Sequence, residues 1–142
     1  MEHNKALGLL SLARKGGNIG LGEEAVGAAA RAQKARLIVV AGDCSDHSLR
    51  RIKGFVAGTK QPWLQIETSK DELGDALGIT SCAMAVITDV QLALAFVKAL
   101  GEDEKNADLL AELQIRTERV KKRRQEEKAH QNNIRHGKKR TK

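Results

Sequence analysis

Two short and continuous apolar runs, at residues 36–41 and 83–88, constrain the fold of this 142-residue chain more than any other feature. Both contain β-branched side chains, and neither alternates apolar with polar residues as a half-exposed strand would. Each run therefore predicts a strand that is covered on both faces. A sheet built on such strands needs a layer of helices on either side.

Helical patterns lie between these strands. Apolar residues recur at helical spacing in five segments, and two weaker strand patterns complete the alternation. We expect helices at residues 4–14, 22–34, 45–57, 68–77 and 89–100, and further strands at 18–21 and 61–66. The candidate N-caps are Ser45 or Asp46, Thr68 or Ser69, and Asp89. Strands that alternate with helices predict an α/β fold, here a three-layer α/β/α sandwich with a small mixed sheet over residues 1–101.

Residues 102–142 form a charged extension that is basic from about residue 116. The chain has a formal net charge of +7, but residues 116–142 hold 12 basic and only 3 acidic side chains. We expect its first turns, from about residue 107, to dock on the domain. After Val120 no large apolar residue occurs before Ile134, so we expect residues 121–142 to be disordered or a solvated helix. Its candidate phosphate contacts are Lys121, Lys122, Arg123, Arg124, Lys138, Lys139 and Arg140.

The sequence excludes several classes of protein. No basic segment followed by a long apolar run opens it, and no apolar run approaches the roughly 20 residues of a membrane span. Cys44 and Cys82 lie far apart and form no CxxC pair, which indicates neither a disulfide framework nor a metal site. We therefore expect a cytoplasmic protein without a membrane partner, a metal or a cofactor.

The sequence contains little that indicates a catalytic site. No lysine followed by Ser or Thr ends the glycine-rich stretch, so a P-loop is excluded, and no Gly-x-Ser-x-Gly elbow occurs. Residues 44–47 include Cys, Ser, Asp and His, but neighbours on one loop seldom point at one reacting atom. Asp43 follows a buried strand, where α/β proteins bind ligands, yet capping of the next turn is the more usual role. We expect a protein that is not an enzyme.

The stretch at residues 15–24 holds four glycines within seven residues and leads directly into an alanine-rich helical pattern. Glycine permits positive φ and lets a ligand approach the backbone closely. A loop of this kind at a helix start leaves N–H groups that can hold an anion or a phosphate. The alternative is a tight turn between two helices that binds nothing.

Basic residues are concentrated in the same half of the chain as the glycine-rich stretch. Residues 1–60 hold 10 basic and 5 acidic side chains, and a solvated face is the alternative reading. With no Tyr, two Phe and one Trp, the chain lacks the aromatic platforms on which single-stranded RNA stacks. Recognition by backbone amides and cations is suited instead to structured RNA. The candidate cations at one edge of the sheet are Arg14, Lys15, Lys34, Arg36, Arg50, Arg51 and Lys53.

Four stretches occur in the order seen in a known family. These are 12–16 with 22–24, the apolar run 37–41 with Asp43 and Ser45, the Leu-Gly-x-Ala-x-Gly-like 73–78, and 85–89. Together they resemble the kink-turn RNA-binding ribosomal protein family, in its bacterial YlxQ-type branch. The resemblance covers about residues 5–100.

The resemblance implies an α/β/α fold and two RNA contacts. The segment Gly22, Glu23 and Glu24 would meet the sheared G·A pairs of a kink-turn. The loop Ile79, Thr80, Ser81 and Cys82 would cap the unstacked nucleotide of its bulge. RNA-binding members usually show Gly-x-Asn-Glu where this chain has Gly-Glu-Glu-Ala at residues 22–25.

The resulting hypothesis is a non-enzymatic, monomeric protein that recognises kink-turn-like RNA and is associated with the ribosome or its RNA. One alternative is a protein-interaction adaptor whose basic tail binds RNA non-specifically. The other is a small nucleotide-binding enzyme.

Overall fold

The computed structural model describes the backbone of residues 2–140 and the side chains of residues 5–134. Helices and strands alternate through the first hundred residues, as the sequence predicts. The elements are α1 (Glu2–Lys15), β1 (Ile19–Leu21), α2 (Gly22–Arg31), β2 (Leu37–Val40), α3 (Asp46–Val56), β3 (Trp63–Gln65), α4 (Lys70–Leu77), β4 (Met84–Ile87), α5 (Val90–Ala99) and α6 (Ala107–Arg140).

The four strands form one mixed sheet in the order β1-β4-β2-β3. Strand β4 is antiparallel to both β1 and β2, whereas β3 is parallel to β2. Leu21 and Val39 both pair with Ala85, so β1 and β2 finish at the end of the sheet where β4 begins. We call this the Gly22 end. The other end, where β2 begins and β4 finishes, we call the Arg36 end.

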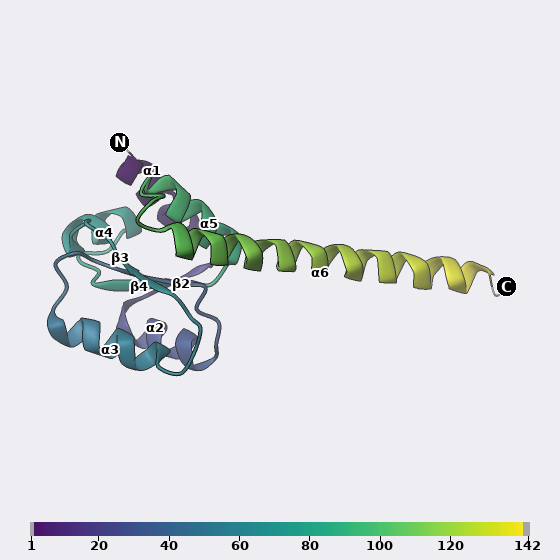
Figure 1. Cartoon of the computed structure of the whole chain (residues 1–142), viewed down its shortest axis with the longest axis horizontal. Helices are drawn as coiled ribbons and strands as arrows, with labels where there is room; N and C mark the ends of the chain where they lie inside the picture. Colours follow the sequence, from purple (N-terminus) through teal and green to yellow (C-terminus); the bar gives the residue numbers. More distant parts are fainter. Residues whose placement is uncertain (1, 141–142) are drawn as a thin grey trace.

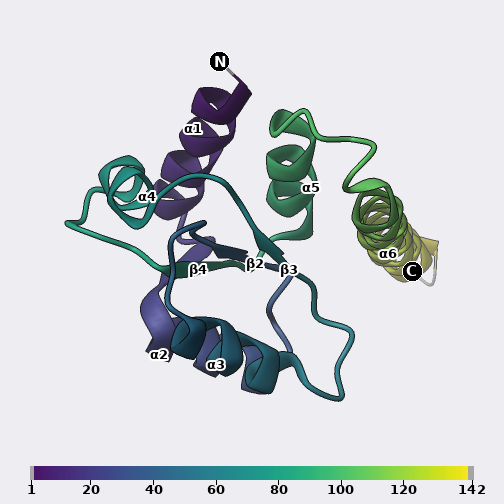
Figure 2. The same ribbon diagram turned by 60° about the vertical axis from the view of Figure 1, so that its left-hand side comes forward.

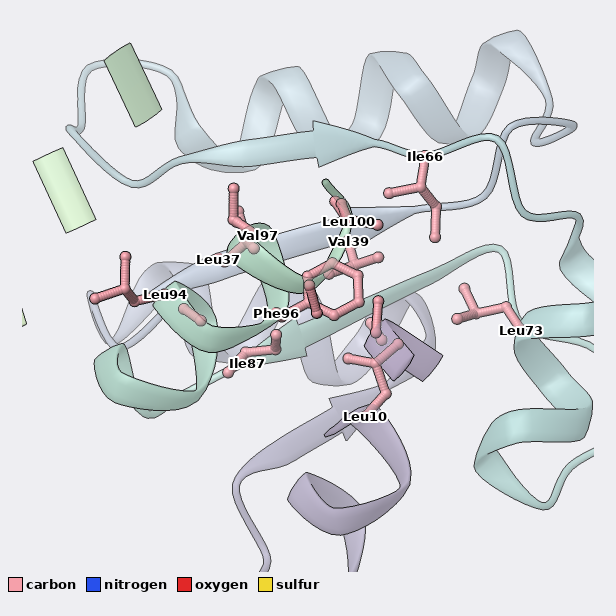
Figure 3. Close-up of a cluster of buried hydrophobic side chains, with 14 of the residues drawn as sticks. Leu10, Leu37, Val39, Ile66, Leu73, Ile87, Leu94, Phe96, Val97 and Leu100 are labelled. Carbon is pink, nitrogen blue, oxygen red and sulfur yellow. The ribbon is translucent and has the colours of Figure 1, made fainter. Parts of the chain in front are cut away.

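Helices cover both faces of the sheet, which confirms the predicted three-layer sandwich. Helices α1, α4 and α5 lie on one face, and α2 and α3 lie on the other (Figures 1 and 2). Phe96 is fully buried between the sheet and the first group of helices, next to Leu10 and Leu37 (Figure 3). On the opposite face, Val26 and Ile52 pack in a second buried cluster. All eight residues of β2 and β4 are buried, as continuous apolar runs require.

Side-chain caps set the starts of three helices. Of the candidate pairs, Ser45 caps α3 and Ser69 caps α4, where Glu72 completes a capping box. Asp89 caps α5, as predicted. Each cap satisfies backbone N–H groups that the first turn of a helix leaves unpaired.

Most of the predicted elements are longer than the observed ones, and the difference in length is largest for α2 and β3. Helix α2 ends at Arg31 rather than at residue 34, because Gln33 adopts a left-handed φ of 56° that a helix cannot contain. The third strand starts at Trp63 rather than at residue 61. There the Gln61 side chain is buried, accepting from the Ala35 N–H at 3.0 Å and donating to the Ala30 carbonyl at 3.0 Å.

Helix α6 is docked at its beginning and solvated afterwards. Leu113 is fully buried in the main core, and Leu109, Leu110 and Val120 pack against that core. From residue 121 to residue 134 every side chain is exposed, and this part of the helix extends away from the body (Figure 1). Residues 121–134 therefore form a solvated helix, which is one of the two forms expected for this part of the chain. Within the described residues, none of the helices has the length and apolar character needed to cross a membrane.

Candidate functional site

Helix α2 begins without a side-chain cap, at the Gly22 end of the sheet. Gly22 has a φ of +88°, and the preceding Leu21 is extended and offers no side-chain hydrogen bond to the first turn. A Cβ at Gly22 would meet no atom within 4 Å, so glycine is required here for its backbone angle and the space above it is open. The first-turn N–H groups of α2 can therefore reach a ligand.

The loop at residues 79–82 lies beside this helix start. The Cys82 thiol is buried, donates to the Met84 carbonyl at 3.1 Å and is hydrogen-bonded to the backbone of Gly22. Burial raises the pKa of this thiol, and hydrogen bonds that the backbone of Met84 and Gly22 donates to the sulfur oppose the rise. Cys82 was predicted to contact the ligand, but only 4% of it is exposed. It joins the loop to α2 and leaves Thr80 and Ser81 exposed at the surface.

A glycine in α4 holds the same loop in place. A Cβ at Gly74 would lie 2.8 Å from the Cα and N atoms of Ser81 and 2.9 Å from the Ile79 carbonyl oxygen. Only glycine allows so close an approach, which is the physical reason for the first glycine of the 73–78 motif. Gly78 ends α4 with a φ of +76°, and the Arg14 guanidinium lies directly over it, 2.9 Å from where a Cβ would stand. Arg14 is thus brought next to the loop.

The two carboxylates that follow Gly22 differ in their surroundings. Glu23 forms an ion pair with Arg51 of α3, and the Arg51 guanidinium lies 5.1 Å from the centre of the Phe55 ring. Glu24 is exposed and, among the described residues, forms no hydrogen bond or ion pair. The charge of Glu23 is therefore largely offset by Arg51, whereas Glu24 can accept a hydrogen bond from a ligand.

Not all predicted site residues meet at one place. Gly22, Glu23, Glu24, Arg51 and the 79–82 loop lie together at the Gly22 end, with Arg14 close by and Arg50 exposed on α3. The glycine-rich stretch is not one loop, because β1 separates the turn at Gly17 from the helix start. Lys15 consequently precedes a turn at the other end of β1. Lys34 lies at the Arg36 end, where the Arg36 N–H donates to the Ile87 carbonyl.

The basic residues of the extension are spread around α6. Lys121, Lys122, Arg123 and Arg124 are exposed on it, and the side chains of Lys138, Lys139 and Arg140 lie outside those described. Arg123 also lines a cavity together with Arg36, which is one of the candidate edge cations, and with Arg116 and Arg119, which were not predicted as site residues. In the sequence, the only sign of this cluster is that Arg116, Arg119 and Arg123 are three and four residues apart, a spacing that places them on one face of a helix. Arg36 is distant from them in the sequence.

The polar residues that follow β2, at positions 43–47, form hydrogen bonds within the protein. The Asp43 carboxylate accepts from the Lys70 N–H at 2.7 Å, and the Ser45 hydroxyl accepts from the Ser48 N–H at 3.1 Å. Burial, followed by the neighbouring Asp43 carboxylate, raises the pKa of the Cys44 thiol, which keeps it protonated and unreactive near neutral pH. Among the described residues no group of three or more His, Cys, Asp and Glu side chains could hold a metal ion.

The domain is a small α/β/α sandwich with an open helix start and a neighbouring loop at one end of its sheet. The family model described as "Ribosomal protein L7Ae/L30e/S12e/Gadd45 family" matches residues 4–95. The chain belongs to this family, which confirms the membership that the motifs predict.

Two solved structures share the fold at low sequence identity. One is a protein of unknown function from Bacillus halodurans, with a TM-score of 0.63 and 21% identity over 69% of this chain and 98% of the other. The second is a 15.5 kD RNA-binding protein from Giardia lamblia, with a TM-score of 0.54 and 21% identity over 73% of this chain and 88% of the other. Among curated proteins, none matches the sequence.

Proposed function

We propose that this protein binds structured RNA of the kink-turn kind at the Gly22 end, without catalysing a reaction. The observation that carries the proposal is the uncapped start of α2 next to the 79–82 loop, in a domain of the L7Ae/L30e/S12e/Gadd45 family. The structural similarity to an RNA-binding protein from Giardia is consistent with it. The ribosome or its RNA is the proposed setting, because the family is one of ribosomal proteins.

The chemistry of the Gly22 end suits a folded RNA. The free N–H groups at the start of α2 are donors for phosphate oxygens or for purine acceptors. The exposed Glu24 carboxylate accepts from the exocyclic amino group of a purine or cytosine, a pairing that offsets its repulsion by phosphates. Arg14 supplies a cation next to the loop. Ile79 is half-buried and, with Thr80, provides a small surface for one unstacked base.

The exposed part of α6 adds affinity that does not depend on RNA sequence. Lysines and arginines that neutralise phosphates release counterions, so such binding weakens steeply with salt. Recognition at the Gly22 end depends on shape and hydrogen bonds and is less sensitive to salt. The two contributions can therefore be separated by titration.

The test is a binding titration of the full chain against a kink-turn hairpin and a matched hairpin whose G·A pairs are disrupted. We expect at least a tenfold preference for the kink-turn, or about 1.4 kcal/mol. Glu24→Ala should change that preference, because it removes the acceptor at the open helix start. Equal binding to both hairpins with a steep salt dependence would show that the tail alone binds RNA.

The second candidate is a protein-interaction adaptor with a non-specific RNA-binding tail. It is favoured by one observation, the two glutamates at residues 23 and 24 where RNA-binding members usually have Gly-x-Asn-Glu. An adaptor would show no kink-turn preference in the same titration, and Glu24→Ala would leave RNA binding unchanged.

A further inference from the structure

Four arginines surround one cavity at the Arg36 end of the sheet. The cavity has a volume of about 230 Å³ and is lined by Arg36 before β2, by Val90 at the start of α5, and by four residues of α6. The α6 residues are Arg116, Arg119, Val120 and Arg123. Their spacing places them on one face of the helix. Segments about eighty residues apart in the sequence thus contribute to a single basic site.

The docking of α6 makes the site a built feature of the fold. Val120 packs against the main core and holds this stretch of helix against the body. Arg116 donates from Nη2 to the Lys60 carbonyl and from Nε to the Glu112 carboxylate, each at 2.8 Å, and its side chain is only 21% exposed. Arg36 is half-buried and donates to the Gln33 carbonyl at 3.4 Å. Two guanidinium groups are therefore held in position before any ligand arrives.

The positive charge of the cavity is only partly neutralised by the protein. Glu112 pairs with Arg116, and the Asp89 carboxylate, next to Val90, accepts from the Leu92 N–H as the cap of α5. In the described part of the chain, Arg119 and Arg123 are exposed and form neither a hydrogen bond nor an ion pair. Guanidinium groups crowded in this way repel one another unless an anion lies between them.

We infer that this cavity binds a backbone phosphate of RNA, as a second RNA site at the Arg36 end. The planar guanidinium group matches phosphate oxygens with two parallel hydrogen bonds. The cations continue beyond the cavity, which suits a polyanion better than a single small anion. On the body, the exposed Lys34 lies two residues before Arg36, and the exposed Lys60 lies next to Arg116, whose guanidinium contacts the Lys60 carbonyl. The inference rests on the proposed function only in taking RNA as the ligand.

The two sites are at opposite ends of the same sheet and use different means. The Gly22 end offers backbone N–H groups and a loop, whereas the Arg36 end offers side-chain cations. A kink-turn held at the Gly22 end leaves the second site free for a neighbouring strand or helix. The protein then holds two RNA segments against each other.

The test uses two double variants of the full chain that lose the same charge from the same helix. Arg119→Gln with Arg123→Gln alters the cavity, and Lys121→Gln with Arg124→Gln is the control, since neither of its residues lines the cavity. The four positions are exposed, and Gln is a good helix former, so all should fold. The helix content and the fluorescence of the single Trp63 check this.

The first probe is a short RNA duplex without a kink-turn, titrated between about 50 and 200 mM salt. The cavity variant should bind it at least tenfold more weakly than the unaltered protein, and the control less than threefold. Losing the contact with this phosphate should also lower the salt slope by roughly 1. Arg36→Gln, which removes a cation from the body rather than from α6, should weaken duplex binding as well.

Each outcome decides the inference. Equal losses of duplex affinity for the cavity variant and the control would overturn it, because the extension would then attract RNA only through its overall positive charge. A larger loss of binding to an oligoglutamate peptide than to RNA would overturn it in favour of an acidic protein partner. If the protein shows no kink-turn preference but the cavity variant still loses duplex affinity, the proposed function fails and the second site stands.

Discussion

The Gly22 end and the Arg36 end of the sheet differ in what positions their binding groups. At the Gly22 end, backbone geometry does so, through Gly22 at positive φ and the close contact of Gly74 with the 79–82 loop. At the Arg36 end, a docked helix brings long side chains to one cavity. Backbone positions are held by local sterics, whereas the arginine cluster exists only while α6 stays packed. Binding at the Gly22 end should therefore tolerate the loss of nearby cationic side chains. Binding at the Arg36 end should be lost when α6 no longer packs against the body.

The largest expected effect comes from undocking α6. Leu113→Ala removes a fully buried side chain from the core and should lower the free energy of unfolding by about 2–5 kcal/mol. Because α6 carries three of the four cavity arginines, duplex RNA binding should fall as well. Denaturant unfolding and RNA titration measure both. Ile115→Ala, at a residue of the same helix that is 46% exposed, is the control and should cost much less.

The next effect is confined to the Gly22 end. Gly74→Ala forces a Cβ to within 2.8 Å of the Ser81 backbone, so the loop must shift. Such overpacking should cost about 1–3 kcal/mol of stability and remove most of the kink-turn preference. Duplex binding at the Arg36 end should be unchanged.

Gly54→Ala is the control for that substitution. Gly54 lies in α3, and a Cβ there would meet no atom within 4 Å. Alanine should stabilise the helix by up to about 1 kcal/mol. A kink-turn preference that survives Gly74→Ala would show that the 79–82 loop does not contact the RNA.

A smaller effect is expected from the ion pair between α2 and α3. Glu23 and Arg51 are 41% and 51% exposed, so a double-mutant cycle with Glu23→Gln and Arg51→Gln should give a coupling energy of about 0.2–1 kcal/mol. Glu23→Gln should also strengthen RNA binding, because it removes a carboxylate and frees the Arg51 cation. Weaker binding after Glu23→Gln would mean that this carboxylate accepts a hydrogen bond from the RNA.

The smallest expected effect is a pH dependence of the free energy of unfolding, caused by Cys82 at the Gly22 end. Since burial raises the pKa of the Cys82 thiol above its usual 9.0, the folded state favours the protonated form. This contribution to stability is fully present below about pH 9 and is lost as the pH rises through the folded-state pKa. Melting temperatures at neutral and alkaline pH measure the loss. Cys82→Ala should reduce it, and an unchanged profile would contradict the assignment.

The sequence alone predicted the layers and several local details, because the forces behind them act between neighbours in the chain. The apolar run at residues 36–41 cannot form a half-exposed strand, and Ser69 and Asp89 satisfy the helix starts that directly follow them. The motifs also predicted the family correctly. The boundaries of α2 and β3 were wrong by two or three residues. The apolar pattern does not show the left-handed φ of Gln33, and the burial of Gln61 depends on contacts with Ala30 and Ala35, which are distant in the sequence.

The candidate site was predicted less well, because it depends on strand direction. Strands β1 and β2 are both antiparallel to β4, so they run in the same direction, and α2 returns from the end of β1 to the beginning of β2. Lys34 and Gly22 therefore fall at opposite ends of the sheet, although only twelve residues separate them. Cys82 looks like any other residue of its loop in the sequence, but the contacts with Gly22 and Met84 bury it.

The sequence by itself determined the α/β/α layering, the open helix start at Gly22 and the basic character of the extension. Hydrophobic pattern, glycine and charge are properties of short segments, so they can be read without knowing the fold. Only the tertiary structure decided that Arg36 meets Arg116, Arg119 and Arg123. That cluster requires the sheet register to place Arg36 at one end and the burial of Leu113 and Val120 to hold α6 beside it.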